Sequence, residues 1–414
     1  MTTITRRRLL GGVASLAGVS LLPACGDDDS GSSNKLTIWT FSTNQKQHLE
    51  AFAAAHPDLD VDIVSYSLDD LHERLLVALT GGTGLPDVTQ LVLRRSDEFF
   101  RTRQFFDLTD TLGPLEKDFP PGYLLGFNGK IHAFLMGPGN MGLWVNREAL
   151  ARHGIDVDTL DTWSAIAEGG RALKQATGGK KYLFLQPGGV DGFNYFNGFY
   201  HSRGGQWIAE DGTVVADTAL VADTLDYFAQ RRKEEIAYRG YWAEPSFFDA
   251  VKSETVVGFG ANFSVGSLTL PKNVPDQAGK WRLLTWPKWA ADAPVQTGGF
   301  GGSLYAGLAR TRNPDGVRQF VKWWLTPEGL KAQQQALGLI GYKPAAQLLE
   351  PEQPNPYFGQ KIGADLAAVT LPPFSYADWA AVTKTVQYAL DQTLLGKWTP
   401  QQAASESLAE LRRR

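Results

Sequence analysis

The alternation of strand and helix patterns after residue 34 constrains the fold of this chain most. Short apolar runs suited to buried strands occur at 35–41, 61–64 and 86–92, and a stretch with helical spacing separates each pair. The second helical stretch ends at Gly81-Gly82. Its apolar face comprises Leu71, Leu75, Leu76 and Leu79. This alternation predicts an α/β fold with a parallel sheet and right-handed crossovers.

The carboxyl ends of these strands form the edge of the sheet at which ligands are expected to bind. These ends lie at 41–44, 66–70 and 93–96. At the first of them, Ser42 and Gln45 have the spacing of a capping box, which predicts that a helix begins there. We therefore expect the first contacts with a ligand at the ends of the strands or just after them.

The first 24 residues have the pattern of an export signal. Arg6, Arg7 and Arg8 precede an apolar run from Leu9 to Ala24, which is too short and too rich in glycine to span a bilayer comfortably. The arginine pair is typical of the twin-arginine export route, and an ordinary basic n-region is the alternative. We expect residues 1–24 to be removed from the mature chain.

Cys25 follows the apolar run directly, and it is the single cysteine of the chain, so it has no intramolecular disulfide partner. Leu-Pro-Ala-Cys at 22–25 resembles the lipobox of a bacterial lipoprotein, which predicts lipid attachment at Cys25. A fortuitous cysteine in a plain secretory signal is the alternative. Cys25 is followed by Gly, Asp and Ser alone at 26–33, so we expect residues 25–33 to form a flexible tether.

Length and charge narrow the class of the mature protein. Loss of residues 1–24 removes three of the 40 basic residues and leaves 37 against 44 acidic ones, a net charge of about −7. This negative balance argues against nucleic acid as a partner. About 390 remaining residues exceed one ordinary core, so we expect two domains. The hydrophobic content of 43% argues against disorder beyond the tether.

Short motifs along the chain resemble those of family 1 extracellular solute-binding proteins, the sugar-capturing subunits of ABC importers. They fall at 35–41, 85–88, 106–110, 129–133, 142–150, 161–163, 298–303, 315–325 and 341–344. Examples are Lys-Leu-Thr-Ile-Trp-Thr-Phe at 35–41, Leu-Pro-Asp-Val at 85–88 and Gly-Tyr-Lys-Pro at 341–344. Each motif alone is weak evidence. Together the motifs extend over residues 34 to about 345 in the family's usual order, and a lipoprotein signal precedes them. This combination is fairly specific.

The resemblance implies a two-lobed, maltose-binding-protein-like fold of type II that closes around its ligand by hinge bending. It places 34–138 plus 263–312 in an N-terminal lobe and 139–262 plus 313–414 in a C-terminal lobe. Crossings between lobes are expected near 137–140, 260–262 and 312–314. Glycine clusters at the first two would absorb changes in φ and ψ, and ordinary turns are the alternative.

Carbohydrate recognition requires aromatic faces for C–H patches and polar side chains for hydroxyl groups. The candidates near the first strand ends are Trp39, Phe41, Ser42, Asn44, Asp69 and Arg94. Those from the second lobe and the crossings are Asn140, Trp144, Asn194, Tyr195, Trp242, Asn262, Phe300 and Tyr342. Trp379 is a further candidate near the cleft. Core packing is the alternative for each aromatic residue, and two departures from the family pattern, His132 and Phe263, weaken the transfer near the second crossing.

Other chemistries fit the sequence poorly. Gly-Pro-Gly-Asn-Met-Gly at 137–142 matches a dinucleotide fingerprint, but the following 143–145 segment is a predicted strand and not the required helix. Asn262 to Gly266 lacks the first glycine of a nucleophile elbow. The six histidines show no metal-binding spacing. We therefore expect no catalytic residue, no metal and no cofactor.

The functional expectation is a lipid-anchored, monomeric, non-enzymatic receptor that works outside the cytoplasm, on the outer face of the membrane or in the periplasm. It would capture a mono- or oligosaccharide in an interlobe cleft and deliver it to ABC permease subunits. One alternative is the same role for a non-sugar solute. Another is a secreted glycoside-active enzyme with two carboxyl groups roughly 5–10 Å apart. An anchored adhesion protein would need an exposed apolar patch.

Overall fold

The computed structural model describes residues 34–414 apart from short gaps. The omitted positions are 1–33, 42, 121, 137–138, 210, 243, 295, 300–301, 338–341, 349–352, 368–374 and 376. The expected signal, the tether and Cys25 therefore lie outside the described residues. No helix in the described part of the chain is long and apolar enough to cross a membrane.

The first lobe is built on a six-stranded sheet with the order β2-β1-β3-β11-β5-β4. The strands are β1 (Lys35–Thr40), β2 (Asp60–Ser65), β3 (Val88–Val92), β4 (Leu124–Phe127), β5 (Lys130–Leu135) and β11 (Ser303–Gly307). β1 pairs in parallel with β2 and β3, as the sequence predicts. β11 is antiparallel to both β3 and β5, and β4 is antiparallel to β5. The sheet is therefore mixed, because β11 returns from the other lobe in the opposite direction.

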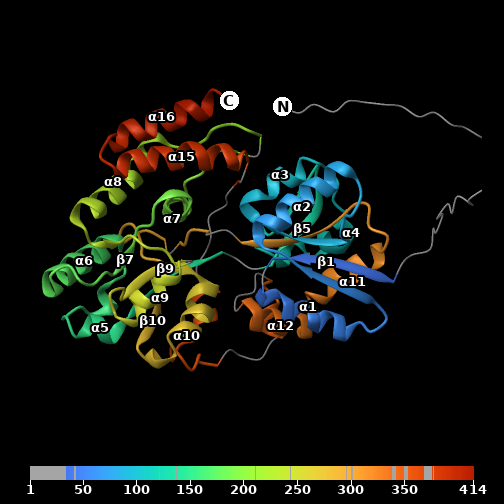
Figure 1. The fold of residues 1–414 in the computed structure, drawn as a ribbon, viewed down its shortest axis with the longest axis horizontal. Helices are drawn as coiled ribbons and strands as arrows, with labels where there is room; N and C mark the ends of the chain where they lie inside the picture. The colour runs from blue at the N-terminus through green and yellow to red at the C-terminus, as the bar shows by residue number, and fades with distance from the viewer. Residues whose placement is uncertain are drawn as a thin grey trace, which may run out of the picture. The chain divides into compact units, whose positions relative to one another are not determined.

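Helices cover both faces of this sheet (Figure 1). They are α1 (Thr43–Ala55), α2 (Leu68–Gly81), α3 (Ser96–Phe100), α4 (Thr109–Leu112), α11 (Pro314–Trp323) and α12 (Pro327–Leu337), with short 3₁₀ turns η1 (Leu93–Arg95) and η2 (Gly113–Asp118). α2 follows its predicted pattern. Ser67 caps its first turn, Gly82 ends it with a positive φ of 70°, and Leu76 is only half-buried on the apolar face.

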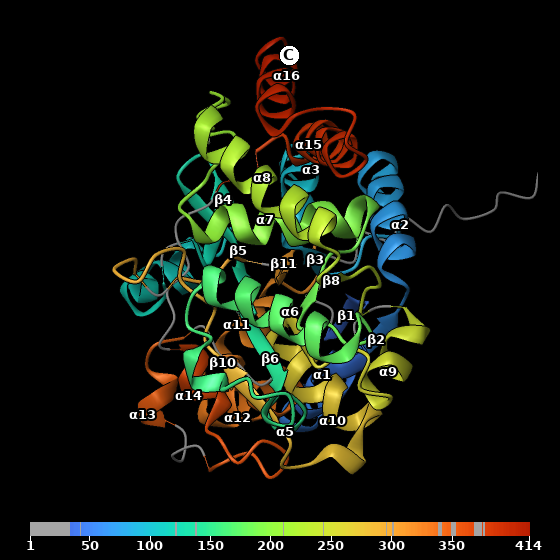
Figure 2. The same ribbon diagram turned by 90° about the vertical axis from the view of Figure 1, so that its left-hand side faces the viewer.

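The second lobe has a three-stranded antiparallel sheet with the order β10-β6-β9, and a two-stranded parallel pair (Figure 2). The strands are β6 (Met141–Asn146), β7 (Phe184–Leu185), β8 (Ala237–Tyr238), β9 (Gly258–Asn262) and β10 (Trp281–Leu284). Its helices include α5 (Arg147–Ala151), α6 (Trp163–Thr177), α7 (Gly189–Ser202), α8 (Thr218–Glu234), α9 (Pro245–Lys252), α10 (Leu270–Asn273), α14 (Ile362–Ala367), α15 (Trp379–Leu394) and α16 (Pro400–Arg412). Shorter turns are η3 (Val157–Thr159), η4 (Val265–Thr269) and η5 (Pro275–Gln277), and α13 (Ala345–Leu348) follows the first-lobe helices.

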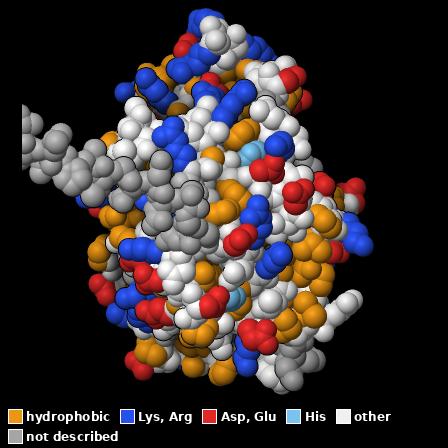
Figure 3. Space-filling view, turned by 90° about the vertical axis from the view of Figure 1, so that its right-hand side faces the viewer, with side chains coloured by type: hydrophobic (Ala, Val, Ile, Leu, Met, Phe, Trp, Pro, Cys, Tyr) orange, Lys and Arg blue, Asp and Glu red, His pale blue; other side chains and the backbone are white. Residues whose placement is uncertain are grey.

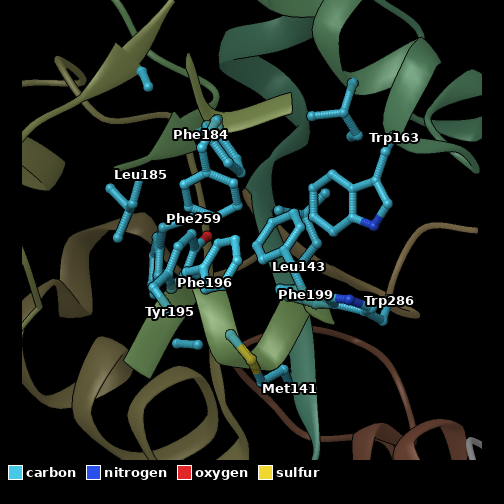
Figure 4. Close-up of a cluster of buried hydrophobic side chains, with 14 of the residues drawn as sticks. Met141, Leu143, Trp163, Phe184, Leu185, Tyr195, Phe196, Phe199, Phe259 and Trp286 are labelled. Atoms are coloured by element: carbon cyan, nitrogen blue, oxygen red, sulfur yellow. The ribbon is translucent and has the colours of Figure 1, made fainter. Parts of the chain in front are cut away.

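Aromatic side chains dominate the core of the second lobe (Figure 4). The rings of Trp163 and Trp286 meet edge to face with centroids 4.8 Å apart, and Phe199 lies 5.0 Å from Trp286. All six residues of β6 are buried at the centre of its sheet. Much of the aromatic content of the chain therefore stabilises this core and is not available to a ligand.

The side chains define lobe boundaries that differ from the expected ones. Residues between Phe263 and Trp286 pack in the second core, because β10 pairs with β6. Phe320 of α11 packs in the first core, with its ring 5.2 Å from that of Phe52. The assignments of 263–286 to the first lobe and of 313–342 to the second lobe are therefore wrong. The chain leaves the first core after Met136. Its second passage lies between 286 and 304, and its third lies between 342 and 357.

Two passages between the cores run side by side. The Met136 N–H donates a hydrogen bond to the Ser303 carbonyl at 2.9 Å. Asn140 and Gly299 form an isolated antiparallel β-bridge. The Met141 N–H donates to Thr297 Oγ1 at 2.9 Å. The second passage is also fixed to α7. We expect hinge motion to be concentrated at this pair of segments.

The contact with α7 explains a glycine in the second passage. A Cβ atom at Gly298 would lie 1.8 Å from the carbonyl oxygen of Gly198, so no larger residue fits without backbone movement. The next residue, Gly299, donates its N–H to Nδ1 of the buried His201 at 3.0 Å. The passage is therefore positioned by a close backbone contact and one side-chain hydrogen bond.

Candidate ligand-binding site

The carboxyl ends of the first two strands present aromatic side chains. Trp39 is nearly buried at the end of β1, and its ring meets the Tyr66 ring edge to face at 5.2 Å. The guanidinium of Arg74 lies 5.2 Å from the Tyr66 centroid. The Phe41 N–H donates to Gln90 Oε1 at 3.1 Å, which fixes the chain as it leaves β1. Aromatic side chains thus lie at this edge of the sheet.

Arg94 follows β3 and provides a partly buried positive charge. Burial lowers the pKa of its guanidinium, and the neighbouring Tyr241, Asp191 and Asp69 oppose that change. Asp191 lies on α7 and Tyr241 lies between β8 and α9, both in the second lobe, whereas Asp69 lies in the first turn of α2. Arg94 is therefore the point at which polar groups of both lobes face one another.

The second-lobe groups around Arg94 are themselves partly desolvated. Burial raises the pKa of Asp191, Arg94 lowers it, and Glu244 raises it. Burial, with a contribution from Asp191, raises the pKa of Tyr241 above its usual range, so its phenol stays protonated. A phenol and an amide can donate hydrogen bonds and accept them, whereas a carboxylate only accepts. The surroundings of Arg94 can therefore satisfy both the donors and the acceptors of a polyhydroxylated ligand.

A cavity of about 1160 Å³ opens beside Arg94. The first lobe contributes η1 and α3 to its walls, and the second lobe contributes α7, α15 and α16. Asn194 and Trp379 line it together with Arg94. At its rim, Arg101 and Asp378 form an ion pair between the lobes at 3.9 Å. Asp378 precedes α15 with a positive φ of 45°, which is unusual for a residue other than glycine.

The structure brings part of the predicted set to this region. Arg94 and Asn194 line the cavity, and Asp69 is exposed within electrostatic range of Arg94. Trp242 is half-buried, with its ring centroid 4.7 Å from that of Tyr241.

Two predicted aromatic residues are part of the core. Trp144 is fully buried in β6, with its ring 5.2 Å from that of Phe358. Tyr195 is fully buried on α7, and its hydroxyl accepts a hydrogen bond from the Gly260 N–H at 3.2 Å. The prediction that these two side chains contact a ligand is therefore not supported, because the central strand and the inner face of α7 hold them inside the second lobe.

Three further candidates have structural roles. Asn140 is buried at the first passage, and its carbonyl accepts from the Phe263 N–H at 3.2 Å. Asn262 Oδ1 accepts a hydrogen bond from the Val265 N–H at 3.1 Å, at the start of η4. Tyr342 packs on the first core, 5.1 Å from the Phe119 ring.

Three other candidates are not described at the site. Ser42, Phe300 and the side chain of Asn44 lie outside the described part of the structure.

Sequence reasoning missed Asp191 and Tyr241. Asp191 lies three residues before Asn194 on α7, so the two share a helix face, and this spacing was the available signal. Tyr241 directly precedes Trp242, which was a candidate. Among the described residues, no group of His, Cys, Asp and Glu is arranged to hold a metal ion. The region around Arg94 is thus suited to bind a polar organic solute through hydrogen bonds and aromatic contacts.

Comparisons of the sequence identify related proteins. A model of the family described as bacterial extracellular solute-binding protein matches residues 42–331. The arabinooligosaccharide-binding protein of Halalkalibacterium halodurans is 24% identical over 339 residues, which cover 77% of this chain and 73% of that protein. The lactose-binding protein of Rhizobium radiobacter is 24% identical over 380 residues, which cover 86% of this chain and 84% of that protein.

Solved structures show the same fold. The GacH receptor of Streptomyces glaucescens superposes with a TM-score of 0.73 at 17% identity, and the match covers 92% of this chain and 98% of that one. A binding protein associated with an ABC transporter of B. animalis subsp. lactis, in complex with β-1,6-galactobiose, gives a TM-score of 0.75 at 16% identity, with coverages of 91% and 96%. The expected two-lobed, maltose-binding-protein-like architecture of type II is confirmed.

Proposed function

Because this chain belongs to the bacterial extracellular solute-binding protein family, we propose that it captures a carbohydrate between its lobes and delivers it to an ABC permease. The membership confirms the resemblance inferred from the sequence motifs. It also places the chain among binding proteins and not enzymes, and it implies a location outside the cytoplasm. The names of the arabinooligosaccharide- and lactose-binding relatives support a sugar as the ligand.

The observation that carries this proposal is the polar and aromatic lining around Arg94. Arg94 comes from one lobe, whereas Asn194 and Trp379 come from the other, and all three line one cavity. A sugar ring stacks on an aromatic face while its hydroxyl groups pair with amide, carboxylate and guanidinium groups. Because both lobes contribute, a bound sugar would favour the closed arrangement over an open one.

The proposed contact residues follow from this lining. They are Arg94, Asn194, Asp69, Trp242 and Trp379 from the sequence prediction, with Asp191 and Tyr241 as further proposals. We also propose Trp39 and Phe41, at the end of β1, as contacts from the first lobe. Figure 3 shows the face on the first-lobe side of Figure 1, where basic and acidic side chains are interspersed.

Anchoring through Cys25 is the second part of the proposal. A lipidated cysteine followed by the tether at 25–33 would hold a monomeric receptor close to its permease. Mass spectrometry of the mature chain from its native host should find a lipid-modified N-terminal Cys25. The Cys25→Ala variant should be released into the soluble extracellular fraction, whereas retention on the membrane would contradict anchoring.

Thermal unfolding of the mature chain against a saccharide panel tests the sugar proposal. A ligand that binds only the folded state at about 100 times its Kd stabilises that state by roughly 2.7 kcal/mol. We expect a saturable rise in Tm with a mono- or oligosaccharide that is recovered intact. Cleavage of the sugar would support the enzyme alternative, and a response only to polyamines or phosphate esters would support a non-sugar solute.

A further inference from the structure

The cavity beside Arg94 continues along α15 for most of the length of this helix. Side chains that line it recur at steps of four residues, as in Ala380, Lys384 and Tyr388, and in Thr383, Gln387 and Asp391. At 1.5 Å per residue, the span from Trp379 to Asp391 corresponds to roughly 18 Å. α15 and α16 pack against each other (Figure 2). The cavity is therefore an elongated groove with an inner end at Arg94 and an outer end beside these two helices.

Aromatic side chains occur at both ends of this groove. At the inner end, Trp379 is held by Phe193, whose ring lies 5.5 Å away. At the outer end, the Tyr388 side chain is 56% exposed, and its ring meets that of Trp398 edge to face at 5.4 Å. Tyr388 thus presents ring surface to solvent while Trp398 fixes its orientation. Paired rings of this kind offer a preformed stacking surface.

The charges along the groove are balanced. Its lining contains six Lys or Arg residues and six Asp or Glu residues. Several of them neutralise one another, as in Arg95 with Glu98 at 2.9 Å and Arg413 with Glu410 at 3.0 Å. A balanced lining gives no net attraction for a polyanion or a polycation. It does provide many hydrogen-bonding groups, which suits an uncharged chain rich in hydroxyl groups.

The groove is also larger than a small-ligand site. Its volume of about 1160 Å³ exceeds the roughly 300–1,000 Å³ of typical ligand pockets. A ligand confined to Arg94, Asn194 and Trp379 would leave the outer part along α15 unfilled. A linear ligand that starts at Arg94 can extend to Tyr388 without leaving the groove.

We propose that the ligand is an oligosaccharide whose outer sugar units bind along α15 and stack on Tyr388 beside Trp398. This inference rests on the proposed function and adds chain length to it. The inner contacts at Arg94 and Asn194 select the terminal unit. The outer contacts on α15 and α16 increase affinity with each added unit until the groove is filled.

Isothermal titration of the mature chain with two size series tests this inference. The probes are arabino-oligosaccharides and β-1,6-galacto-oligosaccharides, each from the monosaccharide to the tetrasaccharide. The variants are Tyr388→Ala and, as a matched control, Leu395→Ala, because Leu395 is 62% exposed at the end of the same helix but does not line the groove. Alanine favours helix at an exposed position, so Tyr388→Ala should fold, and circular dichroism checks this.

We expect affinity to rise with length in at least one series. Tyr388→Ala should weaken the longest ligand by roughly two- to tenfold, the size of one aromatic contact, and leave the shortest ligand unchanged. Leu395→Ala should match the wild type throughout. Equal affinities for short and long sugars, or equal affinities of the two variants for the longest sugar, would overturn the inference while leaving a sugar receptor intact. Failure of every sugar in the wild type would overturn both proposals.

Discussion

The cleft edge of the first lobe and the interior of the second lobe differ in how aromatic and polar side chains are used. At the first-lobe edge, Trp39 and Tyr66 lie at the ends of β1 and β2, and the partly buried Arg94 follows β3. In the second lobe, Trp144 and Tyr195 are enclosed in a core of stacked rings. Tryptophan and tyrosine side chains occur both at the edge of a cleft and inside a core, so their presence does not distinguish the two. A charged or amide side chain at an element end is therefore the better guide to a binding site, since burying it without a partner is costly.

The largest expected effect tests the core assignment of Trp144. Trp144→Ala should lower the free energy of unfolding by about 3–5 kcal/mol, because it leaves a cavity against Phe358 in a fully buried strand. Chemical denaturation measures this loss. The milder Trp144→Phe should fold and bind the ligand with the wild-type Kd. A weakened Kd in a stably folded Trp144→Phe protein would contradict the distinction between core and cleft.

Substitution of Arg94 should weaken ligand binding and leave folding stability almost unchanged, the reverse of the result expected for Trp144. Arg94→Met keeps much of the apolar stem but removes the guanidinium, so affinity should fall by roughly ten- to a hundredfold, as for the loss of a charge-assisted hydrogen bond. The melting temperature without ligand should change little. Arg318→Met, at a partly exposed position on α11, is the matched control and should bind normally. An unchanged Kd for Arg94→Met would remove this residue from the site.

A third prediction uses acid sensitivity to compare the lobes. His48 is buried against Trp324, with ring centroids 3.8 Å apart, and burial lowers its pKa to about 3. Because the unfolded pKa is near 6.5, the unfolded chain binds the proton first, and this contribution to stability is lost as pH falls below about 6.5. The loss should approach about 2 kcal/mol at pH 5.

Substitution separates this effect from general acid unfolding. His48→Leu should flatten the dependence of stability on pH between about 6.5 and 4, measured by urea unfolding. A pH profile of His48→Leu that is identical to that of the wild type would contradict the role assigned to burial.

The smallest expected effect concerns the ion pair between Arg101 and Asp378. Both side chains are substantially exposed, so the pair should contribute only about 0.2–1 kcal/mol to closure. Asp378→Asn should weaken ligand binding by about twofold at low salt, and the difference should vanish at high salt. Titration at two ionic strengths measures it. A difference that persists at high salt would mean that Asp378 contacts the ligand directly.

The parts of the fold that could be predicted are those specified by local patterns. β1, β2, β3 and the helix ended by Gly82 follow from apolar periodicity and end signals. The lobe boundaries do not, because they depend on the long-range pairing of β10 with β6. Gly260 illustrates the difficulty. A Cβ there would lie 2.5 Å from the Tyr195 hydroxyl, so this glycine serves close packing within β9 and not a hinge.

The candidate site was predictable to a similar degree. Arg94 and Asn194 were identifiable from polar chemistry at element ends. Asp191 and Tyr241 depend on how the second lobe faces the first, which no local pattern specifies. Trp144 and Tyr195 were misassigned because their surroundings are set by tertiary packing in the second lobe.

Hydrogen exchange of the mature chain, with and without the sugar that stabilises it best, tests the central claim most directly. Slower exchange is predicted on binding at 93–95, at 190–194 on α7 and at the start of α15, where both lobes line the groove. Exchange in β6 should stay slow and unchanged. Protection that is confined to segments away from this groove would contradict the account.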